Sequence, residues 1–167
     1  MKKRLAFVLI VMSISGLVAC GSKNIQTIIS KELGIDVSDG NKVTCSDRHR
    51  GFHGDGVAYI TLSFSDEKTL ERIKDAAEWK RFPLDETVKA LVYGVSDRDS
   101  TMGPFLTDEE GNALIPEIQN GYYLLIDRQA EPGKAERADI LRRSSFNFTL
   151  GIYDTDTDML YFCKLDT

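Results

Sequence analysis

Residues 146–165, which read FNFTLGIYDTDTDMLYFCKL, decide the fold. In the first half, Phe146, Phe148, Leu150 and Ile152 alternate with smaller or more polar residues, a period of two that is typical of a β-strand. The polar run 154–158 then interrupts the pattern, and a second apolar stretch covers 159–165. This arrangement predicts two antiparallel strands joined by a turn.

Three further stretches towards the N-terminus predict strands. In 58–64, Ala58, Ile60, Leu62 and Phe64 share one face, and the polar residues between them predict a solvated second face. Residues 122–126 are continuously apolar, which predicts a central strand covered on both sides. A shorter alternation around Val43 predicts a strand over residues 42–49.

Three segments carry helical spacing. Residues 25–33 place isoleucines and a leucine at i, i+3, i+4 and i+8. A second helix follows the acidic start at 65–67, and a third follows Pro83 and stops at Gly94. The segment 94–121 holds four Gly and two Pro without a sustained period, and we interpret it as an irregular cover pinned by buried apolar residues.

The order of these elements indicates an α+β fold. One helix, two strands, two helices and three strands predict about five strands in a largely antiparallel sheet packed by two or three helices. We assign residues 25–167 to this single globular domain, which follows a cleaved signal peptide.

The first 19 residues are typical of a secretion signal. Lys2, Lys3 and Arg4 form a cationic start, and an apolar stretch follows from Leu5 to Ala19. This stretch is shorter than the roughly 20 predominantly apolar residues that cross a bilayer as a helix, so we do not expect it to remain as a membrane span.

The end of this segment, Leu17-Val18-Ala19-Cys20, resembles the lipobox of bacterial lipoproteins. The resemblance implies cleavage before Cys20, diacylglycerol on the Cys20 sulfur and, in many bacteria, an acyl chain on the new amino terminus. Residues 20–24 would then be the lipidated cysteine and a short tether. The expected location is the extracytoplasmic face of a bacterial membrane, and the sequence leaves the inner and outer membranes open.

The charge of the mature chain disfavours several partners. Without residues 1–19, 18 basic residues oppose 26 acidic ones. Such a chain has no broad cationic surface for nucleic acid, and anionic lipid headgroups would repel it. We therefore expect the chain to contact the membrane through its lipid anchor alone.

Both histidines of the chain fall between residues 47 and 56. His49 and His53 lie close in sequence to Asp47 and Asp55, and imidazole and carboxylate groups together are ligands for zinc. The spacing matches no established metal motif, so the alternative is a glycine-shaped connection with local hydrogen bonds. We predict no cofactor for this chain.

Cys45 and Cys163 remain after lipidation. Both lie in predicted strands of an exported chain, where oxidation to a disulfide is feasible. The alternative is two separate buried thiols.

The sequence contains no nucleophile elbow, HExxH motif, phosphate loop or dinucleotide glycine pattern, which disfavours an enzyme. The leading hypothesis is a noncatalytic lipoprotein that binds an envelope protein or a small ligand. One alternative is a metal-assisted hydrolase built on the His49 and His53 region. Another is an inhibitor or immunity-type protein that blocks a partner through an aromatic surface at Phe52, Phe105 and Tyr122.

Overall fold

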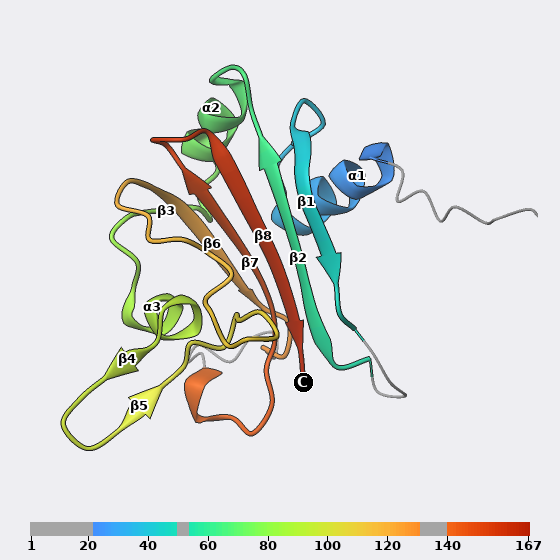
Figure 1. The fold of residues 1–167 in the computed structure, drawn as a ribbon. Coiled ribbons are helices and arrows are strands. Elements are labelled where there is room, and N and C mark those ends of the chain that lie inside the picture. The colour runs from blue at the N-terminus through green and yellow to red at the C-terminus, as the bar shows by residue number, and fades with distance from the viewer. Residues whose placement is uncertain (1–21, 50–53, 131–139) are drawn as a thin grey trace, which may run out of the picture.

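A six-stranded antiparallel sheet forms the centre of the fold (Figure 1). The computed structural model describes residues 22–49, 54–130 and 140–167. Across the sheet the order is β1-β2-β8-β7-β6-β3. The bounds are Asn41–Asp47 for β1, Gly56–Ser63 for β2, Lys80–Arg81 for β3, Gly121–Asp127 for β6, Asn147–Asp154 for β7 and Met159–Asp166 for β8.

This architecture confirms the predicted α+β class and the large antiparallel sheet. The sixth strand is β3, which pairs with β6 over only two residues and has no periodic signal of its own. Residues 122–126 lie in β6, which is covered on both faces as predicted and is paired on both sides, with β7 along its length and with β3 over two residues. The two strands of the C-terminal hairpin, β7 and β8, occupy the middle of the sheet.

The β7–β8 hairpin forms in the predicted place. Its last pair is Asp154 with Met159, and the four residues between them make the turn. The Asp154 carboxylate accepts hydrogen bonds from the Asp156 amide at 2.9 Å and the Thr157 hydroxyl at 2.7 Å. Asp158 adopts a left-handed backbone with φ of 53°, which aspartate tolerates better than most residues.

Helices and loops cover both faces of the sheet. On one face lie α1 (Ser22–Leu33) and α2 (Lys68–Asp75), whose buried residues pack on the strands with Trp79. The other face is covered by α3 (Glu86–Val92), the 3-10 helix η1 (Ile140–Arg142) and the segment after α3. The predicted wet face of β2 is therefore wrong: Thr61, on the α3 face, is only 3% exposed.

Gly151 in β7 allows α1 to approach the sheet closely. A Cβ atom at this position would lie 2.9 Å from the Trp79 ring and 3.0 Å from a Leu33 methyl group. Such distances are well inside van der Waals contact, so a larger residue would force the two side chains to move. The absence of a side chain at Gly151 therefore allows the short distance between α1 and the sheet.

The segment between α3 and β6 is mostly irregular, as expected. It contains one small hairpin, β4 (Val95–Ser96) with β5 (Thr101–Met102). Leu106 and Ile115 are fully buried and hold the segment against the core. In the described part of the chain, every helix is too short or too polar to cross a bilayer.

Candidate functional site

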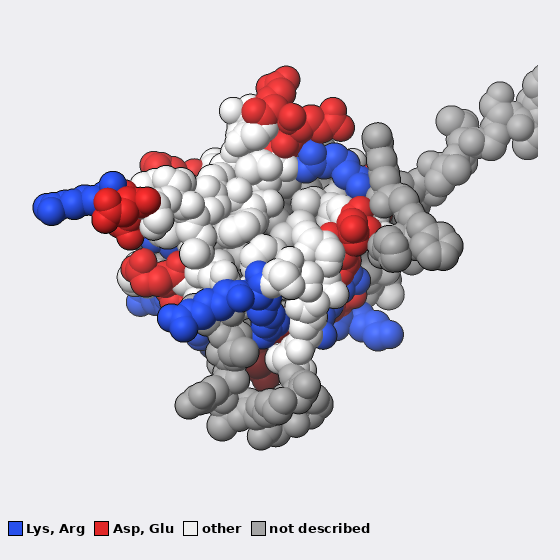
Figure 2. Space-filling model, turned by 90° about the horizontal axis from the view of Figure 1, so that it is seen from below, with Lys and Arg blue, Asp and Glu red and all other residues white. Residues whose placement is uncertain are grey.

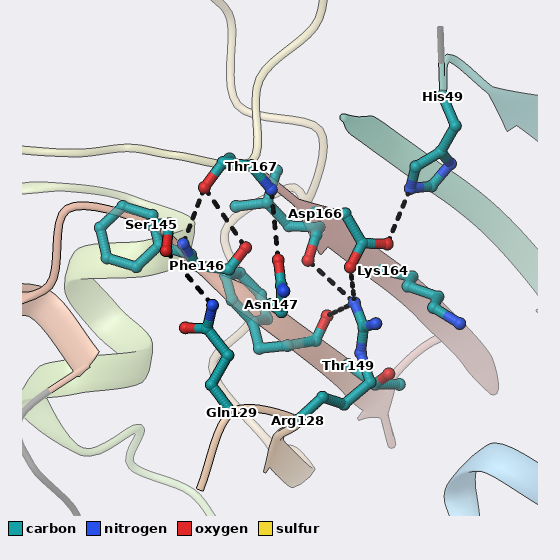
Figure 3. Close-up of polar contacts among 12 residues, drawn as sticks. His49, Arg128, Gln129, Ser145, Phe146, Asn147, Thr149, Lys164, Asp166 and Thr167 are labelled. Atoms are coloured by element: carbon teal, nitrogen blue, oxygen red, sulfur yellow. Dashed lines mark hydrogen bonds and ion pairs between the residues drawn. The ribbon is translucent and has the colours of Figure 1, made fainter. Parts of the chain in front are cut away.

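His49 lies between two carboxylates at one end of the sheet. It follows β1 by two residues, and its Nδ1 is 2.5 Å from Oδ1 of Asp47. Its Nε2 is 3.1 Å from Oδ2 of Asp166, at the end of β8 (Figure 3). Both contacts are hydrogen bonds only if both ring nitrogens carry a proton, since a carboxylate can only accept.

Arg128 extends this row of charges towards β6. Its Nη2 lies 2.6 Å from Oδ1 of Asp166 and also donates to the main-chain carbonyl oxygens of Phe148 and Leu165 (Figure 3). The order Asp47, His49, Asp166, Arg128 alternates acid and base, so each carboxylate faces a donor. These contacts join the ends of three strands.

The environment of Asp47 favours its ionised form. Partial burial alone would raise the pKa of this carboxyl, but hydrogen bonds from the His49 side chain and amide outweigh burial and lower the pKa below its usual value. Asp47 is the most exposed member of the row, with 67% of its side chain accessible. It therefore presents a negative charge to solvent.

Only part of the predicted metal cluster is assembled. Asp47 contacts His49, Asp55 is exposed and takes no part in the row, and His53 lies outside the described residues. Within residues 22–49, 54–130 and 140–167, no three His, Cys, Asp or Glu side chains are placed to hold a metal ion. A metal would also have to displace a carboxylate from His49 to reach a ring nitrogen.

A groove of about 410 Å³ opens beside this row of charges. Its wall is α1, and its floor is the adjoining surface of β1, β2 and β8. Apolar side chains predominate and include Ile28, which is 50% exposed. The lining residues are Ile25, Ile28, Glu32, Cys45, Asp47, His49, Ala58, Ile60, Phe162, Lys164 and Asp166.

Glu32 and Lys164 close one side of the groove. Lys164 Nζ lies 3.2 Å from Oε1 of Glu32, and the other Glu32 oxygen accepts a hydrogen bond from Thr149 at 3.3 Å. The pair therefore ties α1 to β8 and β7. Both charges are therefore paired within the chain. Among the carboxylates that line the groove, Asp47 has the most exposed side chain and is the most accessible to a ligand.

Acidic and basic side chains are interspersed on the lower end of the molecule. Figure 2 shows this end, where blue and red groups lie around a largely uncharged centre. Among the charged residues, Arg143 and Asp127 form a half-buried ion pair with two hydrogen bonds. Asp127 is only 9% exposed in this pair.

Cys45 and Cys163 do not form a disulfide. Strand β2 lies between their strands, and the two side chains occupy opposite faces of the sheet: Cys45 lines the groove, whereas Cys163 belongs to the core under α3. The expectation that they could pair assumed that the first and last strands were neighbours. The separate-thiol alternative describes the structure, although only Cys163 is buried.

The predicted aromatic surface is not assembled from the residues that can be placed. Phe105 is half-buried and packs edge-on against Phe146 at 4.8 Å between ring centroids. Tyr122 is also half-buried in β6, and Phe52 lies outside the described residues. These placements give no support to the inhibitor alternative.

Most of the groove was not predicted from the sequence. Phe162, Lys164 and Asp166 occupy alternate positions of β8 and so share one face, a pattern visible in the sequence. What was not visible is that β8 pairs with β2, which brings Asp166 to His49 across 117 positions of sequence.

Comparison with family models, with curated proteins and with solved structures finds no match for this chain.

Proposed function

We propose that this chain is a membrane-anchored bacterial lipoprotein whose extracytoplasmic domain is a noncatalytic binding module. The lipobox-like segment ending at Cys20 carries the anchoring half of the proposal. Helix α1 begins at Ser22, so the folded domain starts two residues after the lipidated position. Two or three acyl chains hold a protein on a bilayer without help from the domain, at about 0.8 kcal/mol per buried methylene.

The groove beneath α1 supports the binding half of the proposal. Its volume falls in the range of small-molecule sites, about 300–1,000 Å³, and its apolar floor with a charged rim is typical of them. Because the same helix follows the proposed anchor and forms the wall of the groove, the site would lie close to the bilayer surface. A ligand in the groove would cover the exposed apolar side chain of Ile28 and remove it from water.

The charges at the rim favour one ligand chemistry. Lys164 is paired with Glu32, and Asp166 is paired with Arg128 and His49. Asp47 is the outermost carboxylate and stays ionised. We therefore propose a small amphiphile with an apolar body for the floor and a cationic group for Asp47.

The anchor is tested by mass spectrometry of the N-terminal peptide from the membrane fraction. We expect a peptide that begins at Cys20 and carries diacylglycerol. Cys20→Ala should release the chain from membranes or leave residues 1–19 attached, while the matched variant Cys45→Ala should leave both modification and location unchanged. An unmodified peptide that retains Met1 would refute the anchor.

The groove is tested by calorimetric titration of the detergent-solubilised protein with octylammonium and with octanoate. We expect octylammonium to bind more tightly, because only it places a cation beside Asp47. Ile60→Lys should abolish octylammonium binding, because it places a like charge on the apolar floor. The control Met102→Lys changes an exposed apolar residue in β5, remote from the groove, and should bind as the wild type does. Equal binding by the wild type and Ile60→Lys would exclude the groove.

A further inference from the structure

A second pocket lies at the end of the sheet opposite to His49. It is bordered by α2, β3, the start of β6 and the β7–β8 turn, and α2 lies at the same end of the sheet as this turn (Figure 1). Gly121 pairs with Asp154 here, whereas Asp166, which contacts His49, pairs with Asn147 at the other end. The second pocket has a volume of about 580 Å³, which lies within the usual range for small-molecule sites.

The charged side chains that line the second pocket are both cations. Lys74 comes from the last turn of α2 and Arg81 from β3, and no carboxylate is among the described residues of the lining. Arg72 and Lys80, on the same two elements, are each paired with an aspartate. Within residues 22–49, 54–130 and 140–167, the side chains of Lys74 and Arg81 make no hydrogen bond or ion pair. Both cations are exposed and are therefore available to an anion.

Backbone hydrogen bonds hold the elements of the second pocket together. The amide of Phe82, directly after β3, donates to the carbonyl oxygen of Gly121 at 3.0 Å. In the β7–β8 turn, the amide of Thr155 donates to the carbonyl oxygen of Asn120 at 3.1 Å. A site whose backbone is already bonded in this way pays less for ordering when a ligand binds.

Amide and hydroxyl groups make up the uncharged polar part of the lining. Nδ2 of Asn120 donates to the Asp156 carboxylate at 3.0 Å, which orients the amide and leaves its oxygen to accept from a ligand hydroxyl. Gln119 and Thr155 add groups that both donate and accept hydrogen bonds, and the Phe82 ring adds an apolar surface. Such a lining suits a ligand that carries several hydroxyl groups on a carbon ring.

We propose that the second pocket binds a small carbohydrate that carries a phosphate or a carboxylate. The anionic group contacts Lys74 and Arg81, because a guanidinium binds either anion through parallel hydrogen bonds and an ammonium adds a point charge. The hydroxyl groups of the sugar face the amides of Gln119 and Asn120. Its carbon-bound hydrogens face the Phe82 ring.

This site is independent of the groove and of the proposed anchor. The groove presents the exposed carboxylate of Asp47, whereas the charged groups that line the second pocket are cations. The two sites therefore take ligands of opposite charge. Failure of the test of either site leaves the other standing.

The first test is calorimetric titration of the detergent-solubilised full-length protein with glucose 6-phosphate, glucuronate, glucose and inorganic phosphate. We expect at least one of the two anionic sugars to bind at least about tenfold more tightly than glucose, which lacks the charge, and than inorganic phosphate, which lacks the hydroxylated ring. Comparison of the two anionic sugars identifies the charged group that the site takes. Absence of binding by both, or equally tight binding of glucose or of inorganic phosphate, would overturn the proposal.

The second test removes the two cations one at a time. Arg81→Gln and Lys74→Gln should each weaken binding of the anionic sugar about tenfold. The matched controls are Arg98→Gln, between β4 and β5, and Lys89→Gln on α3, which remove the same charges at exposed positions outside the pocket. Thermal unfolding checks that all four variants fold. Binding that ignores both pocket variants, or that falls equally in the controls, would overturn the site.

Discussion

Arg143 and Asp127 form the best-organised ion pair in the described part of the chain. Nη1 of Arg143 lies 2.8 Å from one carboxylate oxygen of Asp127, and Nη2 lies 2.6 Å from the other. The planar guanidinium thus matches the carboxylate with two parallel hydrogen bonds, a geometry that lysine cannot reproduce. The pair joins the end of β6 to the residues after η1.

Loss of the Arg143 guanidinium should destabilise the fold. Arg143→Ala removes two hydrogen bonds from a carboxylate that is only 9% exposed, and we expect the free energy of unfolding to fall by about 2 kcal/mol. Arg143→Lys should recover part of this loss. Urea denaturation measures both, and Arg98→Ala, at an exposed position between β4 and β5, is the control. Equal effects at 98 and 143 would show that the paired geometry contributes nothing.

The close approach at Gly151 predicts intolerance to a methyl group. Gly151→Ala should lower the free energy of unfolding by about 1–2 kcal/mol, because the new Cβ overlaps Trp79 and Leu33. In a Leu33→Ala background one obstacle is gone, so the added cost of the alanine should shrink by at least about 0.5 kcal/mol. A double-mutant cycle by thermal unfolding measures this coupling, and purely additive losses would contradict it.

Asp85 caps α3, and its loss should weaken that helix. Its side chain accepts a hydrogen bond from the Val88 amide at 2.9 Å. Asp85→Ala should therefore cost about 1 kcal/mol in unfolding experiments at pH 7, whereas Asp85→Asn keeps an acceptor and should lose less. An alanine variant as stable as the wild type would show that the cap is dispensable.

The same aspartate predicts a pH dependence. Burial raises the pKa of Asp85, but the Val88 amide and Lys80 outweigh burial, and the net pKa is lowered. The folded state thus releases this proton more readily than the unfolded state. The stabilisation is complete above about pH 4 and is lost as the pH falls through the lowered value. The stability difference between the wild type and Asp85→Asn should narrow over that acidic range.

The two thiols should differ sharply in reactivity. Cys45 is exposed, whereas Cys163 is buried and its pKa is raised by that burial. We expect a maleimide at pH 7.5 to modify Cys45 within minutes and to reach Cys163 only after denaturation. Peptide mass spectrometry before and after urea separates the two sites. Rapid native labelling of Cys163 would mean that the core under α3 opens readily.

Periodicity predicted the elements whose neighbours are close in sequence. The β7–β8 hairpin and the spacing of Ile25, Ile29 and Leu33 in α1 were visible because local geometry imposes a period on the side chains. Strand β3 was not, since Lys80 and Arg81 are too few to repeat a pattern. The mistaken wet face of β2 has another cause: Thr61 is polar but buried, because the irregular segment and α3 cover that face.

The candidate site was predictable only in its local half. Asp47 and His49 are two residues apart, and their contact follows from proximity. Asp166 reaches His49 through the pairing of β2 with β8, and Arg128 reaches Asp166 through the strands between β8 and β6. No local pattern specifies these long-range neighbours, so neither the row of charges nor the groove beside it follows from one sequence.

The place of β8 between β2 and β7 also determines when the fold can form. During synthesis the chain emerges from its N-terminus, so β1 and β2 are made about a hundred residues before the strand that pairs with β2. Until β8 is available, each half of the sheet lacks its neighbour and the core cannot close. The order of synthesis therefore delays completion of the fold until nearly the whole chain has been made.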